Sequence, residues 1–139
     1  MIILACDHNG FELKEKIKAF FNSENITTID VGTYSDDRVD YPDFALAGVE
    51  RVLESPSNVG IFICGTGIGM SMAANRNPRI RAALCSSKHT AIMARKHNDA
   101  NVLVLGSKTL SAKKAIKMIK AFLITDFEKG RHAQRLKKF

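Results

Sequence analysis

The sequence has 139 residues, of which 45% are hydrophobic and 25% are charged, a composition typical of one globular domain. Its apolar runs are too short to cross a bilayer, and no charged segment precedes an apolar one at the amino terminus, so we expect no membrane association and no secretion signal. The three cysteines, Cys6, Cys64 and Cys85, are widely spaced and form no C-x-x-C pair. We therefore expect free thiols, no structural zinc and a cytoplasmic location.

The net charge of +7 is concentrated towards the carboxyl terminus. Residues 1–106 carry 11 basic and 12 acidic side chains, whereas residues 107–139 carry 10 basic and 2 acidic ones. Lysines at 113, 114, 117 and 120 lie opposite the apolar face of an expected helix, as on a solvated surface, which disfavours nucleic-acid binding. Arg131 and Arg135 differ, because a spacing of four places them on one face of a helical turn, where they can clamp an anion.

Apolar runs alternate with helical periodicity along the chain. We expect five strands, at 2–6, 27–31, 59–64, 80–85 and 102–105. We expect helices at about 10–22, 42–53, 88–96 and 111–123, a short one ending at 75, and a last helical stretch from about 125. This alternation predicts a single α/β domain over 1–139, with a Rossmann-like, doubly wound, parallel five-stranded sheet and helices on both faces.

In such sheets ligands bind beyond the carboxyl ends of the strands, and polar residues flank these strands. Asp7 and His8 follow the first strand, and a glycine-rich turn at 65–69 follows Cys64 at the end of the third. His97 and Asn98 precede the fifth strand, and Lys108 follows it. We expect these segments to contribute to one site.

The glycine-rich turn lacks the lysine of a P-loop, and Met70 stands where a dinucleotide-binding turn needs glycine. What remains is a helix start whose backbone N–H groups favour an anion or an oxyanion. Cys64, directly before this turn, can act as a base or as a nucleophile if its thiolate is stabilised. It can equally be a small apolar residue that ends a buried strand, and the residues alone leave these alternatives open.

Six motifs occur in order over essentially the whole chain: ACDHNGFELK (5–14), DVGTY (30–34), DYPDF (40–44), ICGTGIGMS (63–71), HNDANVL (97–103) and FEKGRH (127–132). Together they resemble the type B ribose-5-phosphate isomerase family, which also includes the galactose-6-phosphate isomerase subunits. The cysteine–glycine turn and the segment that begins at His97 are the most specific of them.

The resemblance implies an aldose–ketose isomerase that interconverts ribose 5-phosphate and ribulose 5-phosphate. It implies that Cys64 moves a proton between C2 and C1 through an enediolate, and that His97, with Thr66 nearby, opens the sugar ring. The amides of the turn would stabilise the enediolate. The implied substrate-binding residues are Asp7, His8, Gly65, Gly67, Ile68, Gly69, Ser71, Asn98, Lys108, Arg131 and Arg135.

The resemblance also implies catalysis without a metal or organic cofactor. It implies a homodimer or homotetramer whose active sites are shared between subunits, with the basic tail at about 125–139 reaching a partner. Lys108 stands where the family usually has arginine, which keeps the charge but loses the bidentate fork. His132 is expected either to face the pocket or to cap a helix, Tyr41 is a weaker site candidate, and His89 is expected at the surface.

Other functions stay open at this point. The substrate could be a hexose 6-phosphate, such as allose or galactose 6-phosphate, although one chain with the complete set of motifs favours the pentose. The chain could also be a non-catalytic anion- or nucleotide-binding module, since a fold does not determine function. Cys64 and His97 favour an enzyme, because a binding module needs no positioned thiol base.

Overall fold

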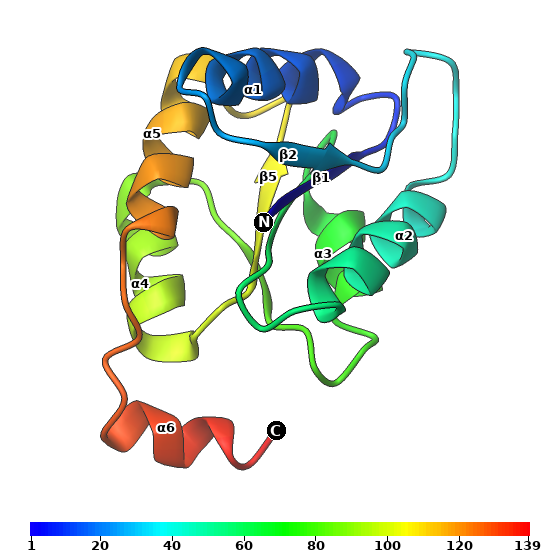
Figure 1. Ribbon diagram of the computed structural model, residues 1–139. Coiled ribbons are helices and arrows are strands. Elements are labelled where there is room, and N and C mark those ends of the chain that lie inside the picture. Colours follow the sequence, from blue (N-terminus) through cyan, green and yellow to red (C-terminus); the bar gives the residue numbers. More distant parts are fainter.

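The computed structural model describes residues 1–139 and contains the parallel five-stranded sheet that the sequence predicts (Figure 1). The strands are β1 (Ile2–Cys6), β2 (Thr28–Asp30), β3 (Val59–Cys64), β4 (Ala82–Leu84) and β5 (Val102–Gly106). The helices are α1 (Phe11–Ser23), α2 (Tyr41–Leu53), α3 (Ile68–Ala74), α4 (Lys88–Asn98), α5 (Ala112–Leu123) and α6 (Arg131–Leu136). The strand order is β2-β1-β3-β5-β4, which confirms the doubly wound α/β class. No helix has the length and apolarity that a membrane span needs.

Helices cover both faces of the sheet. Successive side chains of each strand point to opposite faces, so the apolar strands place a core on each side of the sheet. Leu4 and Ile61 lie in the apolar cluster under α1, α4 and α5. Ile3 and Phe62 lie in the second cluster, under α2 and α3, and all four side chains are fully buried. Cys64 lies in the second cluster with Phe62, two residues earlier on β3, and therefore faces the layer formed by α2 and α3 (Figure 1).

The carboxyl-terminal tail is the one element that the sequence predicts wrongly. Helix begins at Arg131 rather than near residue 125. The backbone N–H of Glu128 donates to the carbonyl of Lys96 at 3.0 Å, so this segment bonds to α4 instead of to a turn of its own. Lys129 and Gly130 have φ angles of 60° and 54°, which an α-helix excludes. The boundaries of the other elements lie within about two residues of the predicted ones.

The parallel connections determine which segments meet at each edge of the sheet. The carboxyl ends of β1, β3 and β5 lie side by side, because Cys6 pairs with Ile63, and Cys64 with Gly106. Helix α4 returns the chain from the carboxyl end of β4 to the amino end of β5, so its last residues lie at the opposite edge. Figure 1 shows α6 below this edge, whereas the arrow of β5 points away from it. At roughly 3.3 Å per residue, a five-residue strand separates the two edges by about 15 Å.

A buried ion pair fastens α1 to the end of β2. The ammonium of Lys14 is fully buried and lies 2.6 Å from Oδ1 of Asp30, and Lys18 Nζ lies 2.7 Å from Oδ2. Burial by itself would raise the pKa of Asp30, but hydrogen bonds from Lys14, Lys18 and the amide of Gly32 outweigh it and lower that pKa. The pair holds the chain after β2 beside β1, where the amide of Cys6 donates to the carbonyl of Gly32 at 2.7 Å.

Replacing Asp30 with asparagine should lower the free energy of unfolding by about 3 kcal/mol, because buried Lys14 would keep only the more exposed Glu15, 3.3 Å away, as a countercharge. Since the pKa of Asp30 is lower in the folded chain than in the unfolded one, its contribution is complete above the ordinary carboxyl pKa. That contribution is lost as the pH falls through the folded-state value, so wild type and D30N should converge in acid. Urea unfolding followed by circular dichroism measures both effects.

The control is Glu12→Gln. Glu12 pairs only with exposed Lys16, so this variant should unfold like the wild type. A D30N protein that matches E12Q in stability would show that the buried pair does not hold α1 on the sheet.

Candidate active site

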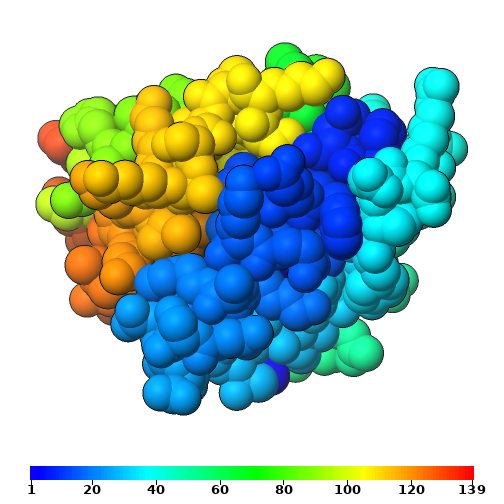
Figure 2. All heavy atoms as spheres, turned by 90° about the horizontal axis from the view of Figure 1, so that it is seen from above, coloured from blue at the N-terminus to red at the C-terminus, as the bar shows by residue number.

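Three loops meet at the carboxyl edge of the sheet, as the sequence predicts. The amide of Asp7 donates to the carbonyl of Ile63 at 3.2 Å, and that of Ser107 donates to the carbonyl of Cys64 at 2.9 Å. These bonds extend the strand pairing past the strand ends and place the loops after β1, β3 and β5 together. Figure 2 looks down on this end of the molecule, where the dark-blue segment after β1 lies beside the yellow segment at the end of β5.

Cys64 lies at the centre of these three loops, where β3 ends, and the residue is 5% exposed. Its sulfur accepts a hydrogen bond of 3.2 Å from the amide of Gly67, the residue before α3. Gly67 has a φ angle of 80°, and a Cβ there would collide with the side chain of Leu84, so glycine is required. An N–H donor at a helix start can stabilise the negative charge of a thiolate.

One further amide of the turn, that of half-buried Gly69, is free to bind an anion. The backbone N–H of Gly69 donates to no other group of the protein, whereas that of Ile68 donates to the hydroxyl of Thr66 at 3.3 Å. Together with Cys64, the turn therefore supplies a thiol and an unpaired N–H donor within a few residues. This is the combination that proton transfer next to a carbonyl requires.

The other two cysteines lack such support. Burial raises the pKa of Cys6 to about 12, even though Lys14 and a backbone hydrogen bond at Thr33 act in the opposite direction. Burial also raises the pKa of Cys85. These two thiols stay protonated near neutral pH and serve packing.

Asp7 and His8 each form a hydrogen bond with a neighbouring segment of the chain. Oδ1 of buried Asp7 accepts the amide of Gly10 at 3.0 Å and so starts α1. Nδ1 of half-buried His8 lies 3.2 Å from the carbonyl of Val39, in the loop between β2 and α2 that projects from the molecule in Figures 1 and 2. His8 therefore fastens this loop to the site.

The remaining predicted site residues near the turn lie on α3 and in the loop after β5. The side chain of Lys108 is exposed and passes beside Gly65, where a Cβ would meet its Cε at 3.5 Å. Ile68 is exposed and Ser71 is half-buried. A Cβ at Gly69 would lie 2.6 Å from the ring of Tyr41, so Tyr41 covers the start of α3. This contact places Tyr41 beside the turn, although the sequence made it only a weaker site candidate.

Within one chain, the predicted site residues lie at two opposite edges of the sheet. His97 and Asn98 end α4, and Arg131 and Arg135 lie on α6, so all four belong to the opposite edge of the sheet (Figure 1). The physical reason is the direction of α4, which must run back towards the amino end of β5. Both arginines are exposed there. His89 is exposed at the start of α4, as expected.

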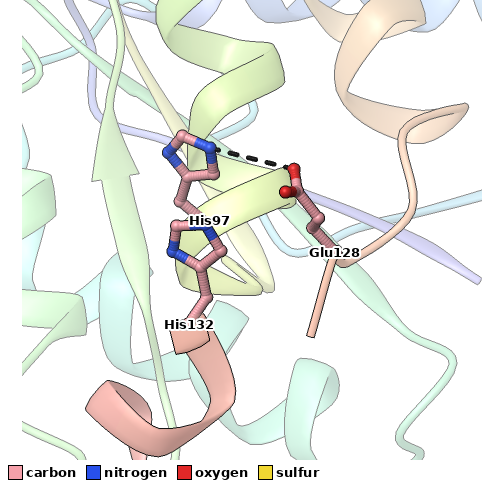
Figure 3. A group of neighbouring side chains, drawn as sticks. All are labelled: His97, Glu128 and His132. Atoms are coloured by element: carbon pink, nitrogen blue, oxygen red, sulfur yellow. Dashed lines mark ion pairs between the residues drawn. The ribbon is translucent and has the colours of Figure 1, made fainter. Parts of the chain in front are cut away.

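At this second edge His97 lies between two other residues (Figure 3). Its ring stacks on that of His132, with the centroids 4.1 Å apart and the planes inclined by 10°. Oε2 of Glu128 lies 4.0 Å from Nε2 of His97. His132 is in the first turn of α6, so it does not cap a helix. Glu128 is a contact that sequence reasoning missed, although it stands in the FEKGRH motif.

The side chain of His132 is buried, and its Nε2 has no hydrogen-bond partner. Burial lowers the pKa of His132, and the nearby His97 and Arg131 lower it further. It is therefore a neutral imidazole at neutral pH.

The donor atoms of His97, Glu128 and His132 all lie within 4.8 Å of one another, which raises the question of a metal site. A metal ion lies in the plane of each imidazole that binds it, and two nearly parallel stacked planes do not converge on one ion. The three residues are thus arranged as a stack rather than as a set of ligands.

Comparison with known proteins places the chain among the sugar isomerases. More specifically, it belongs to the ribose/galactose isomerase family, whose model matches residues 2–139. The resemblance that the six motifs indicate is thereby confirmed.

Individual relatives agree over nearly the whole chain. Ribose-5-phosphate isomerase B of Escherichia coli is 42% identical over 135 residues, which cover 97% of this chain and 91% of that protein. A putative sugar phosphate isomerase of Rickettsia bellii is 48% identical over 137 residues, 99% of this chain and 95% of that protein. The crystal structure of a ribose 5-phosphate isomerase from Thermotoga maritima superposes with a TM-score of 0.96 at 47% identity, covering 99% of this chain and 94% of that one. The structure of ribose-5-phosphate isomerase B from Mycoplasma genitalium, with bound ribulose 5-phosphate, superposes with a TM-score of 0.93 at 41% identity, covering 99% of this chain and 91% of that one.

The different surroundings of the three thiols predict selective alkylation. Iodoacetamide at pH 8 should modify Cys64 in the folded protein well before Cys6 and Cys85, whose raised pKa values leave almost no thiolate. Peptide mass spectrometry identifies the labelled residue, and Cys64→Ser should abolish the early label. Labelling of Cys85 as fast as Cys64 would contradict the prediction.

Proposed function

We propose that this protein interconverts ribose 5-phosphate and ribulose 5-phosphate, with Cys64 as the proton-transferring base. The observation that carries the proposal is the hydrogen bond from the Gly67 amide to the sulfur of Cys64, in a turn whose Gly69 amide is unpaired. The names of the relatives support it, as does the Mycoplasma genitalium structure with bound ribulose 5-phosphate.

The proposed reaction keeps all atoms and electrons within the sugar. The Cys64 thiolate removes the proton from C2 of the open-chain aldose, and the C1 carbonyl becomes the oxyanion of an enediolate. The amide of Gly69 stabilises this negative charge. The hydroxyl on C2 then gives its proton to the oxygen on C1, and return of the proton from the Cys64 thiol to C1 leaves a hydroxyl on C1 and the carbonyl at C2, which is the ketose.

The other residues take the roles that their chemistry permits. His97, with Thr66, opens the sugar ring, because a histidine can both accept and donate a proton near neutral pH. Asp7 and Asn98 bind sugar hydroxyls, and the amides of Gly65, Gly67 and Ile68 together with Ser71 line the sugar. His8, Lys108, Arg131 and Arg135 bind the phosphate.

A second copy of the chain completes the site in this proposal. The two groups of residues are separated by about the length of β5, far beyond hydrogen-bond reach. The principal hollows of a single chain are lined by residues other than Cys64. Ile68, Met72 and Leu84 expose 51%, 68% and 42% of their surfaces beside the turn, an apolar patch that suits burial against another copy.

In a symmetric dimer, the His97 edge and the α6 arginines of one subunit would reach the Cys64 edge of the other. The three free cysteines agree with a reducing, cytoplasmic environment for this assembly.

The mechanism predicts that Cys64→Ala loses at least about 100-fold in turnover while it still binds the phosphorylated sugar, because only the base is removed. Turnover is measured with ribose 5-phosphate, beside allose and galactose 6-phosphates, and binding by calorimetry. Cys85→Ala is the matched control and should retain activity. Undiminished turnover in C64A would refute the mechanism, and a wild type inactive on ribose 5-phosphate would refute the proposed substrate.

The shared site predicts complementation between two inactive variants. C64A and Arg135→Ala, unfolded together and refolded at equal ratio, should regain about a quarter of wild-type activity. Half of the dimers are then mixed, and each mixed dimer has one intact site of two. Each variant refolded alone is the control. If all the residues of a site came from one chain, the mixture would show only the activity of the separate variants.

A further inference from the structure

We infer that Glu128 and His132 are positioning residues for ring opening: they hold the imidazole of His97 between a carboxylate and a stacked ring (Figure 3). This inference rests on the proposed function, and it adds two residues to which no role in the reaction is assigned above. Both act through His97 and not on the sugar itself.

The three side chains come from three separate segments that backbone bonds tie together. His97 is in the last turn of α4, and the amide of Glu128 donates to the carbonyl of its neighbour Lys96 at 3.0 Å. The amide of His132 donates to the carbonyl of Lys129 at 3.0 Å, which sets the start of α6 close behind Glu128. The chain between α5 and α6 is therefore anchored at the point where it presents Glu128 to His97.

Each contact restricts a different freedom of the His97 ring. Stacking at 4.1 Å on His132 opposes rotation of the ring out of its plane. Glu128 faces Nε2, so its carboxylate favours a donor at that nitrogen and compensates the charge when His97 takes up a proton. Because His132 stays neutral, it stacks on a protonated His97 without charge repulsion.

A purely structural role explains His132 poorly. Its side chain is 4% exposed, and its Nε2 is buried without a hydrogen-bond partner, which is unfavourable for folding. An apolar side chain would pack between α4 and α6 without this cost. The imidazole is better explained by what it does for the neighbouring ring.

The proposed reaction has a step that depends on His97 and a step that does not. In ring opening, the anomeric hydroxyl loses its proton, the C1 carbonyl forms, the bond from C1 to the ring oxygen breaks, and that oxygen takes up a proton. Ribulose 5-phosphate has no such ring, because its C5 oxygen carries the phosphate. Removal of a C1 proton from the ketose therefore needs Cys64 and no ring-opening group.

The test measures both steps in Glu128→Gln and His132→Ala. Conversion of ribose 5-phosphate should fall about 10- to 100-fold, the usual effect of removing a group that orients another. Exchange of the C1 proton of ribulose 5-phosphate in deuterated water, followed by NMR, should stay within about twofold of the wild type, since Cys64 is untouched. The conversion rate should also stop rising with enzyme concentration once spontaneous ring opening limits it.

Two further variants make the result specific. His132→Phe keeps an aromatic ring against His97 and should restore most of the aldose conversion that H132A loses. Asp126→Asn, a neighbouring acidic position outside the stack, should behave as the wild type in both assays.

Wild-type aldose conversion in E128Q and H132A would overturn the inference, and so would an equal loss of conversion and exchange, which indicates damage to the whole site. A wild type with neither conversion nor exchange would instead refute the proposed function.

Discussion

All five strands of this sheet point in one direction, and the placement of every functional group depends on that constraint. Each helix between strands has to carry the chain from the carboxyl edge back to the amino edge. Residues that follow strands, such as Asp7, Cys64 and Lys108, therefore gather at one edge. Residues that end a helix, such as His97, gather at the other. The division of the site into two halves follows directly from the topology.

The contrast between the cysteines shows how the ends of strands differ from their interiors. Cys6 and Cys64 both end central strands, yet Cys6 faces the α1 layer and is fully enclosed, while Cys64 faces the start of α3 and meets an N–H donor. One residue type thus serves packing at one position and is equipped for chemistry at the other. The difference comes from the side of the sheet and from Gly67, whose amide donates to the sulfur.

The position of the basic tail is determined by the segment that precedes it. The backbone bond from Glu128 to Lys96 and the bond from Arg95 Nε to the carbonyl of Thr125 hold residues 124–130 against α4, and they bring Glu128 and His132 to His97. The concentration of positive charge after residue 106 thus falls into two parts. The lysines of α5 lie on an amphipathic helix that packs on the sheet, whereas Arg131 and Arg135 project from the far edge. In the proposed dimer, this exposed arginine pair would bind the phosphate of a sugar at the other subunit.

Local patterns in the sequence determined the fold class, the strands, the helices as far as residue 123, and the glycine-rich turn, because periodicity and glycine placement act over a few residues. They also singled out Cys64, although its neighbours alone left its role open. Tertiary structure decided which predicted residues meet, since the direction of α4 sends His97 away from Cys64 within one chain. It also decided where α6 begins, because the bond from Glu128 to Lys96 joins residues far apart in sequence. The partners of His97 could not be predicted for the same reason: stacking and carboxylate contacts form between segments that only the folded chain brings together.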